Sequence, residues 1–336
     1  MVQKESPACM NPAQAPLHDM STPAVRPLGD GALLVDKPAG VSSYGVLLRL
    51  QASFKKNLGL KIKFGHGGTL DPFASGLLIV FFGQGLKLSR YFLEGEKSYE
   101  AVMSFGSETA SGDPTTPPLQ ITTHIPLHAG DLAAGARTFC TAPYAQIPSM
   151  YSAKKMGGLP LYSLARAGVE VEREARVCTV SRFDIHDYAP PLCRFSVDCS
   201  SGTYVRTLAA DFARRLGSLA HLQSLRRTAC CAFGIRQSTS LNILCSEKNL
   251  AELQNSPSTI AFDHMLPHIN AFAIDKRQQQ SLLHGHRSEI AALMNALPDA
   301  PNGLLKLTLN DNISAIARKN PNAGWQLDRV FHWDAS

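Results

Sequence analysis

One aspartate of this chain, Asp71, lies in a segment that suits chemistry better than packing. The twelve residues from 65 to 76 read GHGGTLDPFASG, and their four glycines let a backbone turn sharply and approach another molecule closely. Pro72 stiffens the chain directly after the carboxylate. With a reference pKa near ~3.9, this carboxylate is ionised at neutral pH and can act as a nucleophile. A structural turn would also explain an isolated Asp-Pro step. The segment is not a phosphate-binding P-loop, because no Gly-Lys-Ser/Thr sequence follows it.

Arg206 is the second residue with a chemical implication, because it falls in the first turn of a predicted helix that opens at Gly202. The helix dipole favours anions at that end, so a cation there indicates a carboxylate or phosphate partner. An exposed arginine without such a partner is the alternative interpretation.

A basic loop between residues 148 and 158 combines Tyr151, Lys154 and Lys155 with two flexible glycines. An aromatic ring can stack on a base, and lysines can neutralise phosphates, so the loop is typical of an RNA contact. A solvated surface loop would have the same composition.

Metal and disulfide chemistry have little support in the sequence. The chain contains 8 cysteines and no C-x-x-C pair, which predicts free thiols in a reducing cytoplasm. Two histidine pairs, His264 with His268 and His284 with His286, lack a carboxylate or thiol at a useful spacing, so we expect no metal site. A formal net charge of +6 instead suits a polyanionic partner.

The apolar pattern predicts both strands and helices around these residues. A helix capped by Ser42 and Ser43 should follow a strand that Asp36-Lys37-Pro38 terminates, and a second helix should run from Gly202 to a stop at Gly217. Residues 106–149 contain six prolines and little periodicity, which predicts surface loops. The expected strands cover residues 31–35, 77–82, 98–105, 176–185, 195–199 and 219–225.

The chain length fits one large domain and one small domain. We expect a disordered tail over residues 1–28, which has no apolar core and so does not read as a signal peptide. A domain over 29–265 should follow, and then a β-rich module over 270–336 with one helix near 276–284. The longest notable apolar run, Leu77 to Phe82, is too short for a membrane span.

Six segments together resemble the TruB family of tRNA pseudouridine synthases, the enzymes that modify uridine 55 in the T-loop of tRNA. Each match alone is weak, but all six occur in the family's order between about residues 31 and 234. They are Leu33 to Ser43, Gly65 to Gly76, Lys97-Ser-Tyr99, Pro148 to Ala153, Gly202 to Thr207 and Leu225-Arg226-Arg227.

The resemblance implies a role for each matched residue. Asp71 matches the essential aspartate, Arg206 the arginine that pairs with it, and Tyr99 the tyrosine that stacks on the target base and helps to remove the proton from C5. His66, Tyr204 and Leu225 match residues that frame a uridine flipped out of its stack. Lys37 and Lys154 complete the expected substrate-binding set. The chemistry needs no metal, nucleotide or redox cofactor, and the sequence does not fix whether Asp71 attacks C6 of the base or C1′ of the ribose.

The implied fold is the α/β (α+β) pseudouridine synthase arrangement, a long mixed and mostly antiparallel sheet flanked by helices and loops. Residues 140–175 would form a thumb that grips the T-loop, and residues 270–336 a small PUA-like RNA-binding module. The expected partner is the T-stem-loop of tRNA, bound by a cytoplasmic monomer without an obligate protein partner.

Two other functions stay open at the level of sequence. A relative that uses a guide RNA would modify another RNA, but the long thumb segment favours the stand-alone tRNA enzyme. A tRNA-binding or RNA-folding protein without catalysis would have no need of Asp71, Arg206 and Tyr99 together. The chain departs from the family pattern at Gly67, where threonine is usual, and after Pro114, where a glycine is missing.

Overall fold

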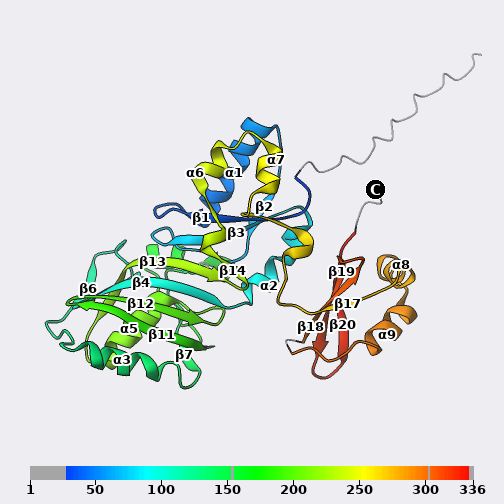
Figure 1. Ribbon diagram of the computed structural model, residues 1–336. Helices are drawn as coiled ribbons and strands as arrows, with labels where there is room; N and C mark the ends of the chain where they lie inside the picture. Colours follow the sequence, from blue (N-terminus) through cyan, green and yellow to red (C-terminus); the bar gives the residue numbers. More distant parts are fainter. Residues whose placement is uncertain (1–27, 153–154, 302, 333–336) are drawn as a thin grey trace, which may run out of the picture.

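A computed structural model describes residues 28–152, 155–301 and 303–332 of the chain. The predicted disordered tail lies outside these residues except for Leu28, whose side chain is buried against the core. Figure 1 shows two units, a large one built on a long sheet and a small one at the C-terminal end. No helix of the described part of the chain is long and apolar enough to cross a membrane.

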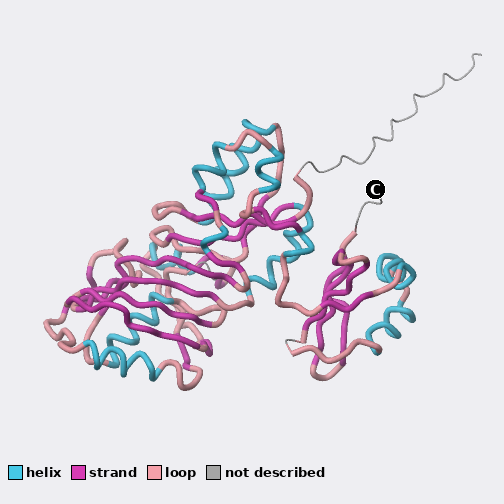
Figure 2. Tube along the Cα trace, in the orientation of Figure 1, coloured by secondary structure: helices cyan, strands magenta, loops and turns pink. Residues whose placement is uncertain are grey.

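The large unit is built on a ten-stranded sheet (Figure 2). Only the β13–β3 and β1–β15 pairs within it are parallel, so the predicted mixed and mostly antiparallel sheet is confirmed. Its main path runs β11 (Val180–Ala189), β12 (Leu192–Cys199), β4 (Lys97–Phe105), β13 (Ala220–Cys230), β3 (Ser75–Phe82), β1 (Gly31–Lys37) and β15 (Thr239–Ser240). The strands off this path are β2 (Phe64–His66), β14 (Phe233–Gly234) and β16 (Thr259–Ala261).

Helices pack against the two ends of this sheet (Figure 1). At one end α1 (Ser43–Leu58) begins at its N-cap, Ser42, which accepts a hydrogen bond from the Gly45 amide, and it ends at Gly59 in the left-handed conformation. Its apolar residues are buried at the predicted helical spacing. The others are α6 (Leu241–Ser246) and α7 (Leu250–Asn255) at this end, α5 (Val205–Arg215) at the other, and the 3₁₀ turn η1 (Gly83–Leu88) with α2 (Ser89–Leu93) before β4.

The prediction of surface loops over residues 106–149 is wrong, because this segment holds three strands and a helix. Helix α3 (Ala129–Thr138) buries Leu132 and Ala136 beside α5 in the core of the large unit. This helix contains two glycines and few large apolar residues, so its sequence has no clear helical periodicity. The strands are β5 (Ser107–Thr109), β6 (Pro118–Ile121) and β7 (Tyr144–Gln146).

Two other boundaries differ from the prediction. The first strand does not stop before Asp36, since Asp36 and Lys37 pair with Leu77 and Gly76 of β3. The helix predicted from Gly202 begins three residues later at Val205, because Gly202 adopts a φ of 80° in the preceding turn. The segment over residues 155–178 contains β8 (Lys155–Met156), β9 (Leu159–Pro160), α4 (Leu161–Arg166) and β10 (Arg176–Cys178), the last paired with β7.

The small unit is a four-stranded sheet with two helices. Polar contacts join it to the large unit, since the Asp328 carboxylate accepts hydrogen bonds from Arg90 and from the Tyr91 hydroxyl. The Arg318 guanidinium also bonds to Asp328 and Glu94. Its elements are β17 (Ala271–Ala273), α8 (Lys276–His284), α9 (Arg287–Asn295), β18 (Leu304–Leu309), β19 (Asn312–Asn320) and β20 (Gly324–Val330).

Replacement of Leu132 by alanine tests the place of α3 in the core. Its side chain is fully buried, so Leu132→Ala should lower the free energy of unfolding by about 2–5 kcal/mol, through lost apolar burial and the cavity left behind. Leu127→Ala is the control, because that side chain is 79% exposed and its loss should change stability by less than about 0.5 kcal/mol. Urea denaturation followed by circular dichroism measures both. Equal effects would contradict the packing of α3.

Candidate active site

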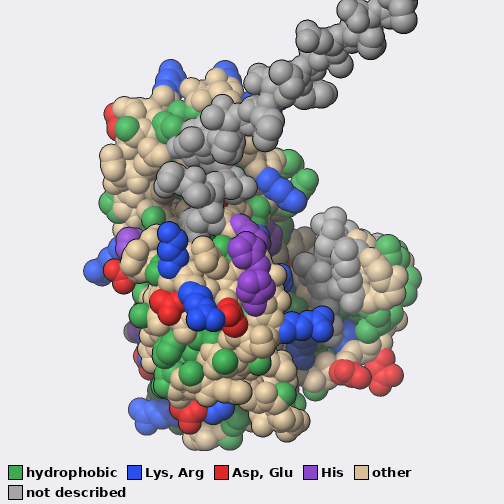
Figure 3. Space-filling view, turned by 90° about the vertical axis from the view of Figure 1, so that its right-hand side faces the viewer, with side chains coloured by type: hydrophobic (Ala, Val, Ile, Leu, Met, Phe, Trp, Pro, Cys, Tyr) green, Lys and Arg blue, Asp and Glu red, His purple; other side chains and the backbone are tan. Residues whose placement is uncertain are grey.

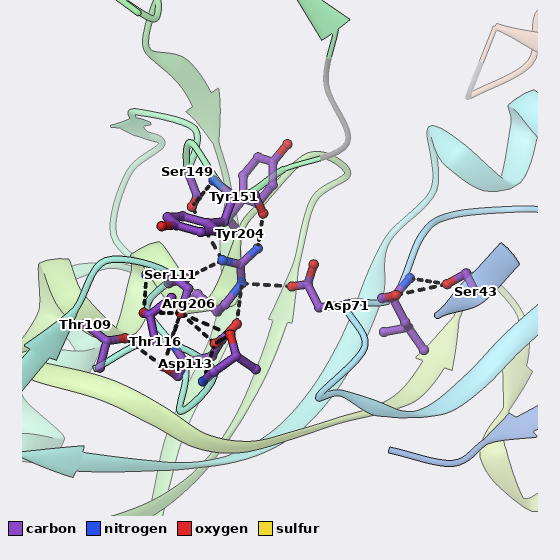
Figure 4. Close-up of polar contacts among 12 residues, drawn as sticks. Ser43, Asp71, Thr109, Ser111, Asp113, Thr116, Ser149, Tyr151, Tyr204 and Arg206 are labelled. Atoms are coloured by element: carbon purple, nitrogen blue, oxygen red, sulfur yellow. Dashed lines mark hydrogen bonds and ion pairs between the residues drawn. The ribbon is translucent and has the colours of Figure 1, made fainter. Parts of the chain in front are cut away.

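Asp71 lies in a short loop between β2 and β3 that a single serine holds in place (Figure 4). The Ser43 hydroxyl, 2% exposed at the start of α1, accepts a hydrogen bond from the Leu70 amide at 2.8 Å and donates one to the Leu70 carbonyl at 3.0 Å. On the far side of Asp71, the Gly40 amide bonds to the Pro72 carbonyl at 2.7 Å. Both flanks of the carboxylate are therefore fixed by backbone contacts.

Lys37 supports the same loop from behind. Its side chain is fully buried, and Nζ donates to the carbonyl oxygens of Val41 at 2.6 Å, Pro38 at 3.0 Å and Pro72 at 3.5 Å. Burial lowers the pKa of Lys37 to about 8, although the Asp71 charge opposes this shift. An enclosed ammonium held by three carbonyls cannot reach a ligand in this conformation, so the structure gives Lys37 a positioning role in place of the predicted substrate contact.

The Arg206 guanidinium points directly at Asp71, as the helix-dipole argument predicted. Its Nε donates to Asp71 Oδ2 at 2.8 Å, with the Arg206 side chain 3% exposed and the Asp71 side chain 31% exposed. Its other nitrogens donate to the carbonyls of Ser111 and of Tyr151, the latter at 2.8 Å. Figure 4 shows the guanidinium between Asp71 on one side and the loop of Ser111 on the other.

A second carboxylate, Asp113, lies behind Arg206. Its Oδ2 is 4.0 Å from Arg206 Nε, and its Oδ1 accepts hydrogen bonds from the Ser111 hydroxyl at 2.6 Å and the Thr115 amide at 2.9 Å. Sequence reasoning did not place Asp113 in the site. The acidic loop around residues 108–114 was the available signal, but nothing in it indicated which arginine it faces.

The pKa of Asp71 is set by opposing effects. Burial raises it above the ordinary value, and this effect exceeds the lowering by the charge and hydrogen bond of Arg206. Asp113 raises it further, while Lys37 lowers it. Asp71 is therefore a desolvated carboxylate that depends on its arginine to stay ionised.

A cleft of about 390 Å³ opens in front of Asp71. Tyr99 from β4 is buried in its wall, and burial raises the pKa of its hydroxyl to about 12. The walls combine predicted site residues with three cations to which the sequence analysis gave no role in the site. The lining side chains include Asp71, Tyr99, Tyr204, Arg206 and Leu225, together with Lys97, Arg176 and Arg227.

A larger cleft of about 800 Å³ lies on the other side of Arg206, between the thumb segment and α5. It shares only Arg206 with the smaller cleft and contains neither Asp71 nor Tyr99. The smaller cleft contains both the carboxylate that is paired with the buried Arg206 and the buried ring of Tyr99, and we therefore take it as the candidate active site.

Tyr204 is fixed by a glutamine that sequence reasoning missed. Gln146 of β7 is 1% exposed, and its Oε1 accepts a hydrogen bond from the Tyr204 amide at 2.8 Å. Its Nε2 donates to the Tyr204 carbonyl at 3.2 Å. The side chain thus caps the start of α5 from a neighbouring strand, a role that no local pattern reveals.

One predicted residue, His66, lies elsewhere. His66 on β2 is half-buried and does not line the cleft. Its Nδ1 is enclosed without a hydrogen-bond partner among the described residues, and burial with the charge of Arg227 lowers its pKa. Lys154 lies outside the described residues. Within the described ranges, no group of three or more His, Cys, Asp and Glu side chains could hold a metal ion.

Comparison with known proteins connects this site to one family. The sequence pattern of the TruB family pseudouridylate synthase, N-terminal domain, matches residues 55–205. The chain is 38% identical over 275 residues to tRNA pseudouridine synthase B of Burkholderia mallei (strain NCTC 10247), covering 82% of this chain and 87% of that protein. It is 41% identical over 223 residues to tRNA pseudouridine synthase B of Bordetella parapertussis (strain 12822), covering 64% of this chain and 86% of that protein.

Solved structures share the fold at lower sequence identity. A chain of the Cbf5–Nop10–Gar1 complex superposes with a TM-score of 0.65 at 21% identity, over 91% of this chain and 86% of that one. A chain of the archaeal box H/ACA Nop10–Cbf5 complex gives a TM-score of 0.63 at 19% identity, over 93% and 89% of the two chains. The predicted fold class is thereby confirmed.

The balance of charges at Asp71 can be measured directly. Arg206→Gln should raise the pKa of Asp71 further, because the largest effect that lowers it disappears. Carboxyl-carbon NMR of aspartate-labelled protein reports the titration, with the Asp71 signal assigned by its absence in Asp71→Asn. Arg226→Gln is the control, since Arg226 pairs with Asp36 instead. An unchanged or lower pKa in Arg206→Gln would show that Arg206 does not hold the charge.

Proposed function

This chain belongs to the TruB family of pseudouridine synthases, and from that premise we propose that it isomerises a uridine of tRNA to pseudouridine with Asp71 as the nucleophile. The observation that carries the proposal is the ion pair of Asp71 with Arg206 at 2.8 Å, at the wall of a cleft that also contains Tyr99 and Leu225. A carboxylate that is partly exposed, desolvated and aimed by a buried cation has the properties of a nucleophile.

The proposed substrate is uridine 55 in the T-loop of tRNA. The relatives' shared name, tRNA pseudouridine synthase B, supports tRNA as the RNA. The formal net charge of +6 also favours a polyanionic substrate such as RNA. On the face drawn in Figure 3, the Lys and Arg side chains lie at several separate places rather than in one patch. We include in the proposal a thumb over residues 140–175 that grips the T-loop, a PUA-like module over 270–336, and a cytoplasmic monomer without an obligate protein partner.

The proposed reaction gives a task to each of the predicted site residues that line the cleft. The base must leave the RNA stack to enter a cleft of this size, because its reacting carbons are inaccessible inside a folded loop. Tyr99 and Leu225 then provide an aromatic and an aliphatic surface for the uracil ring, and Tyr204 borders the entrance. Arg206 keeps the Asp71 carboxylate ionised and aimed while the uracil detaches from the ribose, rotates and rejoins through C5. Both attack at C6 and attack at C1′ are compatible with this arrangement.

Asp71→Asn should abolish turnover and leave tRNA binding intact, because the amide keeps the shape of the carboxylate but is not a nucleophile. The loss should exceed about 10³-fold in the single-turnover rate, measured on an unmodified tRNA transcript with pseudouridine mapped by carbodiimide treatment and primer extension. Asp198→Asn, at a surface pair with Arg182, is the control and should retain activity. An active Asp71→Asn enzyme would exclude this nucleophile.

The rate should depend on the ionisation of Asp71. Burial raises the pKa of this carboxyl above the ordinary ~3.8–3.9. The active carboxylate form is present when the pH is above this raised pKa, and it is lost as the pH falls through the raised pKa. Single-turnover rates between pH 4 and 8 should fall about tenfold per pH unit on the acid side of that value. Circular dichroism at each pH separates titration from unfolding. An acid limb at or below the ordinary aspartate pKa would contradict the assignment.

The same mapping experiment tests the choice of RNA. A single new stop at the T-loop uridine, absent with Asp71→Asn, supports tRNA and the predicted position together. Tight tRNA binding without a stop would shift the proposal to another RNA substrate or to a binding function without catalysis.

A further inference from the structure

Arg227 of β13 faces the candidate active site although the preceding argument gives it no role. It stands two residues after Leu225, so both side chains lie on the same face of the strand. In the antiparallel register of β13 with β4, Arg227 is directly opposite Tyr99. All three line the cleft in front of Asp71.

The guanidinium is held tightly but is not neutralised by the protein. The Arg227 side chain is 2% exposed, its Nε donates to the Leu77 carbonyl at 2.7 Å, and its Nη2 donates to the Gly68 carbonyl at 3.1 Å. Among the described residues, no carboxylate lies within 4.0 Å of it. Nη1 takes no part in the two bonds to the backbone, and the guanidinium also interacts with the Tyr99 side chain, which leaves at least one of its five N–H donors without a partner. One donor of a buried cation thus stays available beside Tyr99.

The neighbouring arginines are satisfied in a different way. Arg206 bonds to Asp71 and to two carbonyls, and Arg226 forms a two-pronged ion pair with Asp36. A buried cation without an anion is costly to the fold, unless a bound group completes its coordination. The backbone of Arg227 packs closely against β3, because a Cβ on Gly76 would lie 2.3 Å from the Arg227 carbonyl oxygen. The charge also acts on its surroundings, since it lowers the pKa of Tyr99 against the effect of burial.

We propose that Arg227 is a catalytic residue, whose guanidinium donates a hydrogen bond to a carbonyl oxygen of the flipped uracil and stabilises the negative charge that the ring carries while it is detached. This inference rests on the proposed function. When the bond from N1 to C1′ breaks, its electron pair passes to the uracil ring and spreads onto the carbonyl oxygens. Meanwhile the Asp71 carboxylate is bonded to C1′ or to C6, according to the point of attack. After rotation, an electron pair of the ring forms the bond from C5 to C1′, and the bond to Asp71 breaks and returns the free carboxylate. C5 then loses its proton to a base while N1 takes up a proton, so no oxidant or reductant is needed. A preorganised donor in a desolvated cleft suits that charge.

A fluorine at C5 of the target uridine separates this role from a structural one. Fluorine withdraws electrons from the ring and stabilises the same negative charge, so it partly replaces a missing donor. We compare single-turnover cleavage of the N-glycosidic bond in tRNA with uridine or 5-fluorouridine at the target, followed by nuclease digestion and mass spectrometry. Arg227→Gln should lower the rate by about 10²–10³-fold with uridine and by at least tenfold less with 5-fluorouridine, while the Kd for tRNA stays unchanged.

Arg226→Gln is the matched control at the adjacent position, and its effect should be small and equal for both substrates. An equal loss for both substrates in Arg227→Gln, or no loss, would overturn the role of Arg227. If Arg227→Gln does not fold, Arg227→Met, which removes the charge and every donor but fills much of the same volume, undergoes the same comparison under the same criterion. A wild-type chain that cleaves neither substrate would overturn the proposed function, and this inference with it.

Discussion

The Arg206 guanidinium is buried, and a buried cation persists in a fold only where carboxylates and carbonyls surround it. Its partners come from three separate parts of the chain, the Asp71 loop, the loop of Ser111 and the thumb residue Tyr151. Removal of any one leaves a donor of this buried guanidinium without its partner. The ion pair therefore requires the long-range arrangement of these segments, and the sheet and helices of the large unit are what bring them together.

The central part of the sheet explains how that arrangement arises. Strand β13 pairs antiparallel with β4 along nine residue pairs, and parallel with β3 at only Arg226 and Arg227. The short parallel contact lies where β3 begins, just after the Asp71 loop. Gly76 permits it, because any side chain there would collide with the backbone of Arg227. Strand β13 thus carries Leu225 and Arg227 between Tyr99 of β4 and the loop of Asp71.

Local patterns drew attention to Asp71 in its glycine-rich loop and to Arg206 at the start of a helix, but they left a structural turn and an unpaired arginine open. The resemblance to the TruB family supplied the pairing of the two residues, whereas α1 and the buried strand β3 could be predicted from the apolar pattern alone. The roles of Gln146, Asp113 and Arg227 could not be predicted, because each depends on a partner more than fifty residues away. Lys37 was predicted to contact substrate because sequence does not reveal burial. Helix α3 was missed because its stability comes from Leu132 packing in the core and not from its own periodicity.

Burial and ion pairing act on Asp71 in opposite directions, and both are needed by a nucleophile. A partly buried carboxylate has less hydration to lose before it attacks, but burial also raises its pKa and favours the unreactive protonated form. Arg206 counters this effect from one side and Lys37 from behind. Because Lys37 is itself held by the carbonyls of the same loop, the position of the carboxylate and its charge are controlled by one set of contacts. A substitution that loosens the loop should therefore change the reactivity of Asp71 even where the geometry of the ion pair is preserved.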